Sequence, residues 1–92
     1  MSDIYTTNKR IRELREHLKL GRGAFANESG IEKKTLENIE HEAQKVYAWH
    51  TETIAKKWPQ FAYWICTGNV LPEAGQISPE IEQKRRDSKR AG

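Results

Sequence analysis

The sequence predicts an all-α protein built from five helices. Apolar residues recur at helical spacing, a proline and several glycines stand where helices would begin or end, and no strand pattern is evident. Ninety-two residues, 36% of them hydrophobic, allow one small domain with little core to spare. We therefore expect a compact helical domain over residues 8–70, preceded by a short arm over residues 1–7.

The first helix is expected to end at about Leu18. Thr7 or Asn8 can cap it, because each side chain offers an acceptor for a free backbone N–H. Its buried face is formed by Ile11, Leu14 and Leu18. Apolar residues that recur every three or four positions lie on one face of a helix and indicate an amphipathic helix.

The second and third helices are expected over residues 22–29 and 33–41, with a sharp turn between them. Gly30 can adopt the left-handed conformation that ends a helix, and Ala26 leaves room for a close crossing. The inward positions are Phe25, Ala26, Ile31, Leu36 and Ile39. Two helices that cross at a tight turn are typical of domains that bind DNA through the second helix.

The fourth helix is expected over residues 47–57, after a polar link. Its inner side is expected to carry Trp49, Thr53 or Ile54, and Trp58. Pro59 suits the first position of a fifth helix, and Gly68 suits its C-terminal end.

Residues 71–92 are expected to form a flexible, basic C-terminal segment. This segment is either a solvated, partly helical tail or a second electrostatic contact with DNA, in which each neutralised phosphate adds about 0.9 to the salt dependence. Its apolar residues fold back on the domain or pair two subunits. They are Leu71, Ile77 and Ile81, together with Val70 immediately before the segment.

The segment LGRGAFANESGIEKKTLENIEH (residues 20–41) resembles the helix-turn-helix of the lambda-repressor-like family, the phage repressor and Cro type, with its xenobiotic-response-element type regulators. Upstream, IRELREHLKL (residues 11–20) is similar to the family's first helix. Downstream, FAYWICTG (residues 61–68) resembles its short closing helix. The resemblance covers about residues 8–70 and implies a structural ion pair between Arg15 and Glu40.

The resemblance also implies which side chains meet DNA. The base contacts would be Lys33, Lys34, Glu37 and Asn38. Lysine can donate to guanine, asparagine can bond adenine, and glutamate can accept from cytosine. The phosphate contacts would be Arg22, Gly23, Thr35, Lys9, Arg10 and Lys45. Arg22 replaces a glutamine usual in the family, Gly21 and Glu32 replace usual cap residues, and Glu42 stands where a glycine is common.

The function implied is a phage or prophage Cro-like or short repressor. It would bind a palindromic operator as a homodimer and occlude the promoter, because a single domain contacts only a few base pairs. The dimer contact is expected at Trp64, Val70 and Leu71. Two alternatives remain: a DNA-binding antitoxin that neutralises a toxin through its C-terminal segment, and a helix-turn-helix-derived module that binds a protein partner.

The sequence does not favour an enzyme or a metalloprotein. His17, His41, His50 and Cys66 match no compact metal motif, so we expect no catalytic residue, no metal and no cofactor. A single cysteine fits a reducing compartment, and no apolar run approaches the roughly 20 residues that span a bilayer. We expect a soluble protein of the bacterial cytoplasm, associated with the nucleoid and not with a membrane.

Overall fold

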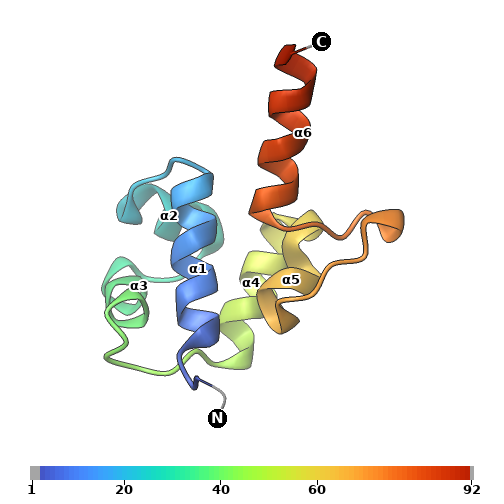
Figure 1. Cartoon of the computed structure of the whole chain (residues 1–92). Coiled ribbons are helices and arrows are strands. Elements are labelled where there is room, and N and C mark those ends of the chain that lie inside the picture. The colour runs from blue at the N-terminus through green and yellow to red at the C-terminus, as the bar shows by residue number, and fades with distance from the viewer. Residues whose placement is uncertain (1–2, 92) are drawn as a thin grey trace.

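The computed structural model describes residues 3–91 and is shown in Figure 1. This part of the chain is all-helical, with no strand and one isolated β-bridge between Leu71 and Gln76. The α-helices are α1 (Thr6–His17), α2 (Arg22–Ser29), α3 (Lys33–Glu40), α4 (Ala48–Lys57), α5 (Ala62–Thr67) and α6 (Pro79–Ala91). Two short 3-10 helices are η1 (Pro59–Phe61) and η2 (Pro72–Ala74). The all-α class is confirmed, but this part of the chain has six α-helices instead of five.

Helix α1 begins inside the segment expected to be an arm. The Asp3 carboxylate accepts a hydrogen bond from the Tyr5 N–H at 2.8 Å, and Thr6 Oγ1 donates to the Asp3 carbonyl at 2.7 Å. Because the helix starts early, neither Thr7 nor Asn8 caps it, and that expectation was wrong. Asn8 is instead buried, and its Nδ2 donates to the carbonyls of Ile39 at 2.8 Å and Gln44 at 2.9 Å. Asn8 thus ties the start of α1 to the end of α3.

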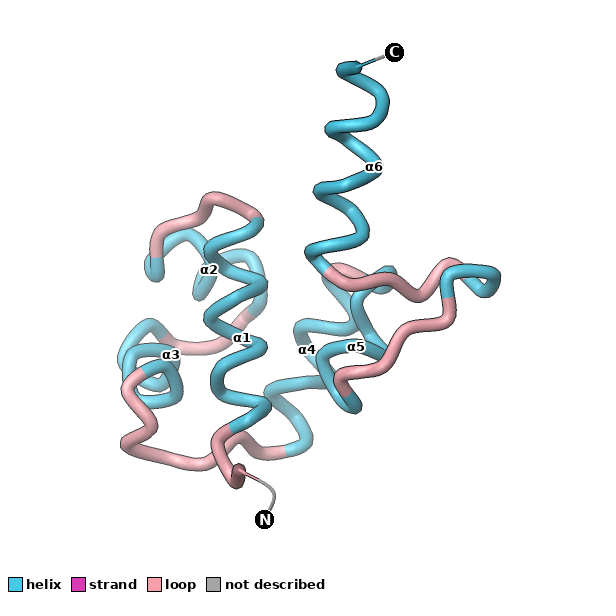
Figure 2. Tube along the Cα trace, in the orientation of Figure 1, coloured by secondary structure: helices cyan, strands magenta, loops and turns pink. Residues whose placement is uncertain are grey.

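Helices α2 and α3 meet at the corner that the sequence predicts. Gly30 has φ 85°, the left-handed conformation, and its N–H donates to the Ala26 carbonyl. The inward residues Phe25, Ile31 and Leu36 are fully buried. Figure 2 shows the short loop that joins the two helices.

Helices α4 and α5 close the core from the other side. Ile54 and Phe61 are fully buried, and the rings of Trp58 and Phe25 stack with centroids 5.0 Å apart. Gly68 ends α5 with φ 80°, as expected. Trp49 is 48% exposed, so the expectation that it lies on the inner side was wrong. Because α4 buries His50 and Ile54, which lie four residues apart, Trp49 faces away from the core.

The segment expected to be flexible carries α6, which rises away from the body of the molecule in Figure 1. Ile77 and Pro79 are buried and Ile81 packs against the core. His17 Nε2 lies 2.7 Å from Glu82 Oε1. These contacts fix the first turn of α6 to α1, which is why the segment does not behave as a loose tail.

Candidate nucleic-acid interface

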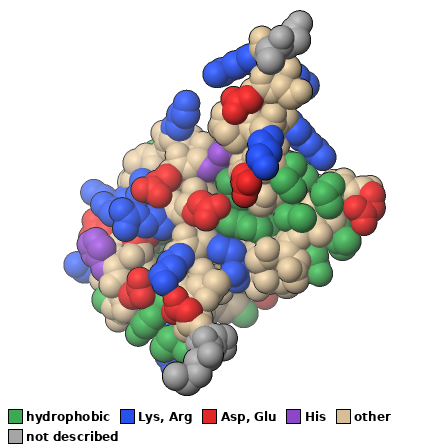
Figure 3. Space-filling model, viewed as in Figure 1, with side chains coloured by type: hydrophobic (Ala, Val, Ile, Leu, Met, Phe, Trp, Pro, Cys, Tyr) green, Lys and Arg blue, Asp and Glu red, His purple; other side chains and the backbone are tan. Residues whose placement is uncertain are grey.

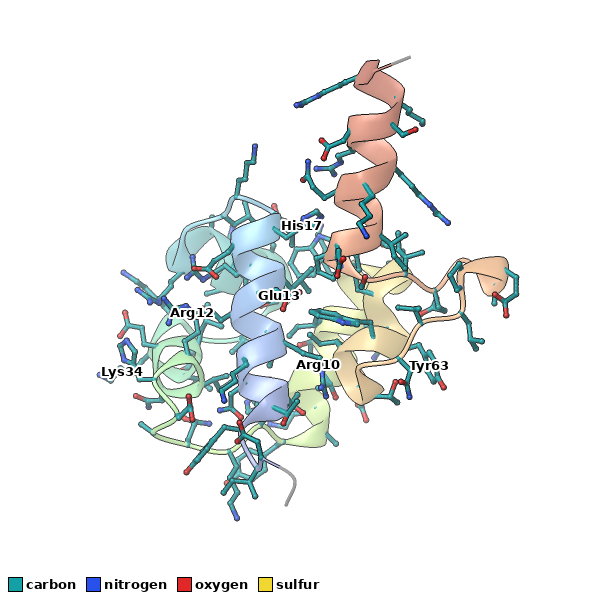
Figure 4. All side chains as sticks on the ribbon, in the orientation of Figure 1. Arg10, Arg12, Glu13, His17, Lys34 and Tyr63 are labelled. Atoms are coloured by element: carbon teal, nitrogen blue, oxygen red, sulfur yellow. The ribbon has the colours of Figure 1, made fainter. Side chains whose placement is uncertain are left out.

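The outward face of α3 is polar along its whole length. Lys33 and Lys34 are exposed, while Thr35, Glu37 and Asn38 are half-buried. Figure 4 shows Lys34 pointing away from the body of the molecule, on the side opposite α5. All four side chains expected to contact bases therefore lie on one helix with solvent access, since the inward positions take up its packing face.

Asn38 has a weakly held side chain. Its Nδ2 lies 3.4 Å from Gln44 Oε1, near the limit of a hydrogen bond. A bond of this length is readily exchanged for another partner, so the amide can turn toward an adenine edge, which offers one donor and one acceptor.

A buried carboxylate at the end of α3 joins the first three helices. Glu40 accepts from Arg15 Nε at 2.6 Å and from Arg15 Nη2 at 3.0 Å, so the expected ion pair is present. The hydrogen bond to Glu40 raises the pKa of Arg15. Arg22 Nε also donates to Glu40, at 3.1 Å. The side chains of Glu40, Arg15 and Arg22 form the Glu40 cluster, which fixes α3 against α1 and α2.

Arg22 combines this anchor with solvent access. Its side chain is 33% exposed, and only its Nε is bonded to Glu40, so its terminal nitrogens remain at the surface at the start of α2. Gly23 is exposed beside it, and a Cβ built on Gly23 meets no atom within 4 Å. The start of α2 therefore offers an arginine and uncrowded backbone N–H groups, which suit a phosphate.

Arg10 does not belong with these residues, contrary to the expectation that it contacts phosphate. Its Nε donates to the Ile65 carbonyl at 3.2 Å and its Nη2 to the Cys66 carbonyl at 3.4 Å. Burial lowers the pKa of Arg10, and Figure 4 shows its side chain directed toward α5 and away from α3. The short helix α5 leaves carbonyls unpaired at its C-terminus, and Arg10 satisfies them.

The remaining phosphate candidates stay accessible. Lys9 is exposed and bonded to the Asp3 carboxylate, which raises the pKa of Lys9. Lys45 is exposed in the loop after α3. Figure 3 shows Lys and Arg side chains gathered over α1 to α3, with Asp and Glu side chains among them.

The acidic side chains keep this face close to charge balance. Glu32 and Glu42 are exposed and Glu37 is half-buried, all on or beside α3. Glu42 also has φ 59°, the left-handed conformation, at the position where the resemblance places glycine. The face therefore carries directed hydrogen-bonding groups and little net charge.

The three residues expected at a dimer contact lie in different environments. Trp64 is only 7% exposed and belongs to the core, so it is not available to a partner and that assignment was wrong. Val70 is half-buried against the core, whereas Leu71 is 43% exposed beside η2. Apolar spacing identifies a residue that prefers burial, but it does not tell whether its own chain or a partner covers it.

Sequence reasoning missed the role of Asn8 as the link between α1 and α3. A signal was available, since Asn8 continues the buried stripe of Ile11 and Leu14 by one helical turn. A polar side chain on such a stripe must find buried partners.

Within residues 3–91, no three His, Cys, Asp or Glu side chains gather as a metal site would need, and no helix has the length and apolar character to cross a membrane. No protein-family model matches the chain, and no curated protein matches its sequence.

Proposed function

We propose that the chain is a transcriptional regulator that binds double-stranded DNA sequence-specifically by placing α3 in the major groove. The observation that carries the proposal is the corner of α2 and α3. Gly30 turns the chain, the apolar side of α3 is fully buried, and Lys33, Lys34 and Asn38 remain outward. The resemblance of residues 8–70 to the lambda-repressor-like family supports the same function.

The size of α3 suits the groove. An α-helix with its side chains is about 10–12 Å across, comparable to the width of the major groove, about 12 Å, and the eight residues of α3 extend about 12 Å along its axis. In that position Lys33 and Lys34 donate to guanine, and Asn38 bonds adenine. Arg22 and the backbone N–H groups of Gly23 hold a phosphate, which sets the register of α3 along the duplex.

A homodimer supplies the specificity that one such helix lacks. Two copies of α3 set one turn of DNA apart, about 34 Å, would bind an approximately palindromic operator. Leu71, exposed beside η2, supports a subunit contact through the segment after α5. Occupation of the operator then excludes polymerase from the promoter, in the manner of a Cro-like or short repressor.

The test is footprinting on the DNA upstream of the chain's own reading frame, at about 150 mM salt. We expect a protected palindrome, and we expect Lys34→Ala and Asn38→Ala each to weaken operator binding about 5- to 150-fold, since a base contact is worth about 1–3 kcal/mol. Lys56→Ala removes an exposed lysine from α4 and should leave binding unchanged. Weak binding that salt abolishes and that Asn38→Ala leaves unaltered would contradict the proposal.

A further inference from the structure

We infer that α6 is a second nucleic-acid-binding surface, which holds phosphate groups without reading sequence and is separate from α3. The inference stands on the anchoring, charge and shape of α6. It does not depend on the function proposed for α3.

The base of α6 is firmly attached to the domain. His17 Nε2 lies within hydrogen-bond distance of Glu82 Oε1, at 2.7 Å, and the two side chains are only 7% and 19% exposed. The His17 ring also packs edge-on against Phe61, with centroids 5.9 Å apart, and Ile81 packs against the core. The direction in which α6 projects is therefore set by the fold.

Beyond Glu82 the helix is neither packed nor apolar. The described side chains of residues 83–90 are all exposed, and none of them is apolar. Five of these eight are basic and one is acidic. A helix of 13 residues is only marginally stable in water on its own. Side-chain pairs one helical turn apart, such as Glu80 with Lys84 at 3.1 Å, add to the stability of α6. Such a surface attracts a partner by charge.

Most of the basic side chains share one face. At about 100° per residue, four of them fall within about 140° of the helix circumference, on the side that carries Glu82. They are Arg85, Arg86, Lys89 and Arg90, and we call them the α6 basic face. Three of them, with Ile77 and Glu82, line a hollow of about 260 Å³. Three basic groups therefore line this hollow, and one of them, Arg86, pairs with Glu82 at 3.1 Å.

The turn between α1 and α2 carries a further basic residue. Lys19 is exposed in that turn and has φ 58°. In Figure 1 the turn rises on the same side of the molecule as α6, and Figure 3 shows Lys and Arg side chains over both. An anionic strand lying between them would meet positive charge on two sides.

The chemistry of this face fits phosphate better than an acidic protein. Arginine bonds phosphate in a two-pronged geometry and lysine bonds it as a point charge. Arg85 and Lys89 lie about 6 Å apart along the helix axis, so successive phosphates of a strand can be held. Protein interfaces rely on buried apolar anchors, whereas nucleic-acid interfaces are polar and strongly basic. Past Glu82, α6 offers no apolar anchor.

Helices α3 and α6 lie at opposite ends of the molecule in Figure 1. The two helices would therefore contact different stretches of DNA. The α6 basic face would hold a second duplex, or a distant part of the same bent DNA, and a molecule with both surfaces could bridge two DNA segments.

The test is binding to a random-sequence duplex across a salt series. The variant Arg85→Ala/Arg86→Ala/Lys89→Ala removes three charges from the α6 basic face. The matched control, Lys56→Ala/Lys57→Ala/Lys84→Ala, removes two charges from α4 and the one α6 lysine that lies off the α6 basic face. If the variant loses two or three phosphate contacts, its affinity for DNA should depend less on salt. Between 50 and 200 mM salt, the affinity of the wild type should fall about 10- to 40-fold more than that of the variant. The control should behave as the wild type does.

Three results would overturn the inference. The first is an equal salt dependence in variant and wild type, with circular dichroism showing that α6 is intact in both. The second is a control that loses as much as the variant, which would show that only net charge matters. The third comes from a competition experiment with polyglutamate and duplex DNA at equal concentrations of negative charge. If polyglutamate displaces all of the duplex from the α6 basic face, the result would favour an acidic protein as the partner.

The outcome is distinguishable from failure of the proposed function. Lys34→Ala and Asn38→Ala should abolish the operator footprint while the salt dependence on random DNA stays that of the wild type. If no operator is found and the α6 variant still loses its salt dependence, the proposed function fails and the α6 inference stands.

Discussion

Replacing Arg15 by methionine should destabilise the protein far more than removing an exposed arginine. The carboxylate of Glu40 is fully buried, and Arg15 supplies two of its three hydrogen bonds, at 2.6 and 3.0 Å. Arg15 Nη1 also donates to the carbonyl of Leu20, in the loop between α1 and α2, at 2.9 Å. Methionine keeps an unbranched apolar stem but removes every donor.

The expected cost is about 3 kcal/mol. Removal of one partner from a buried ion pair costs about 3–5 kcal/mol, because the other charge is left without compensation. Arg22 still donates to Glu40 at 3.1 Å, which places the loss at the lower end. Glu40 also closes α3, where the negative end of the helix dipole disfavours a carboxylate. A loss of this size would lower Tm by about 12–24 °C.

Urea unfolding followed by circular dichroism measures this loss. The control is Arg12→Met, because Arg12 pairs with Glu16 at 3.5 Å where the two side chains are 50% and 56% exposed, and such pairs contribute less than about 1 kcal/mol. If the two variants differ by less than 1 kcal/mol, the Glu40 cluster is not a stabilising buried network.

A double variant separates stability from positioning. Arg15→Met/Glu40→Leu removes both charges, so much of the lost stability should return. Arg22 would then lack its acceptor, and operator binding should remain weaker than that of the wild type. Operator binding restored along with stability would show that Glu40 does not position Arg22.

Two further predictions concern α4 and the end of α3. His50 Nδ1 accepts from the Tyr47 N–H at 2.9 Å, and burial lowers the pKa of His50. The unfolded chain therefore binds more protons at acid pH, so the free energy of unfolding should be full above about pH 6.5 and should fall as the pH drops below it. His50→Gln keeps an acceptor and should reduce that fall, which unfolding measurements from pH 5 to 8 would show. Glu42→Gly should raise the free energy of unfolding by about 1 kcal/mol, because Glu42 has φ 59°, a left-handed backbone conformation that strains any residue except glycine. Glu42→Ala keeps that strain and should give no such gain in urea unfolding.

The sequence predicts the corner of α2 and α3 well because the signals there are local. Gly30 marks the turn, and the inward positions are separated by one helical turn. The positions of Arg10 and Asn8 could not be predicted in the same way. Arg10 bonds residues 55 and 56 positions away, and Asn8 bonds residues 31 and 36 positions away. Which distant carbonyls need a donor depends on how the helices pack.

The sequence also leaves the C-terminal segment undecided. Its charge and its prolines are typical of a tail, yet Ile77, Ile81 and Glu82 fix it to the domain. The decisive partner is His17, whose position beside Glu82 follows from the packing of α1 against the rest of the core. A short-range pattern contains no information on that contact.

The proposed surfaces on α3 and α6 would respond differently to salt. On and beside α3, basic and acidic side chains are nearly balanced, whereas the last turns of α6 carry five basic residues and one acidic residue. Binding through α6 would release counterions and weaken steeply as salt rises, while base contacts by Lys34 and Asn38 would continue to discriminate through hydrogen bonds. The ratio of operator to random-DNA affinity should therefore increase with salt in the wild type. It should change less in the variant that lacks the α6 basic face, because its random-DNA binding has already lost that contribution.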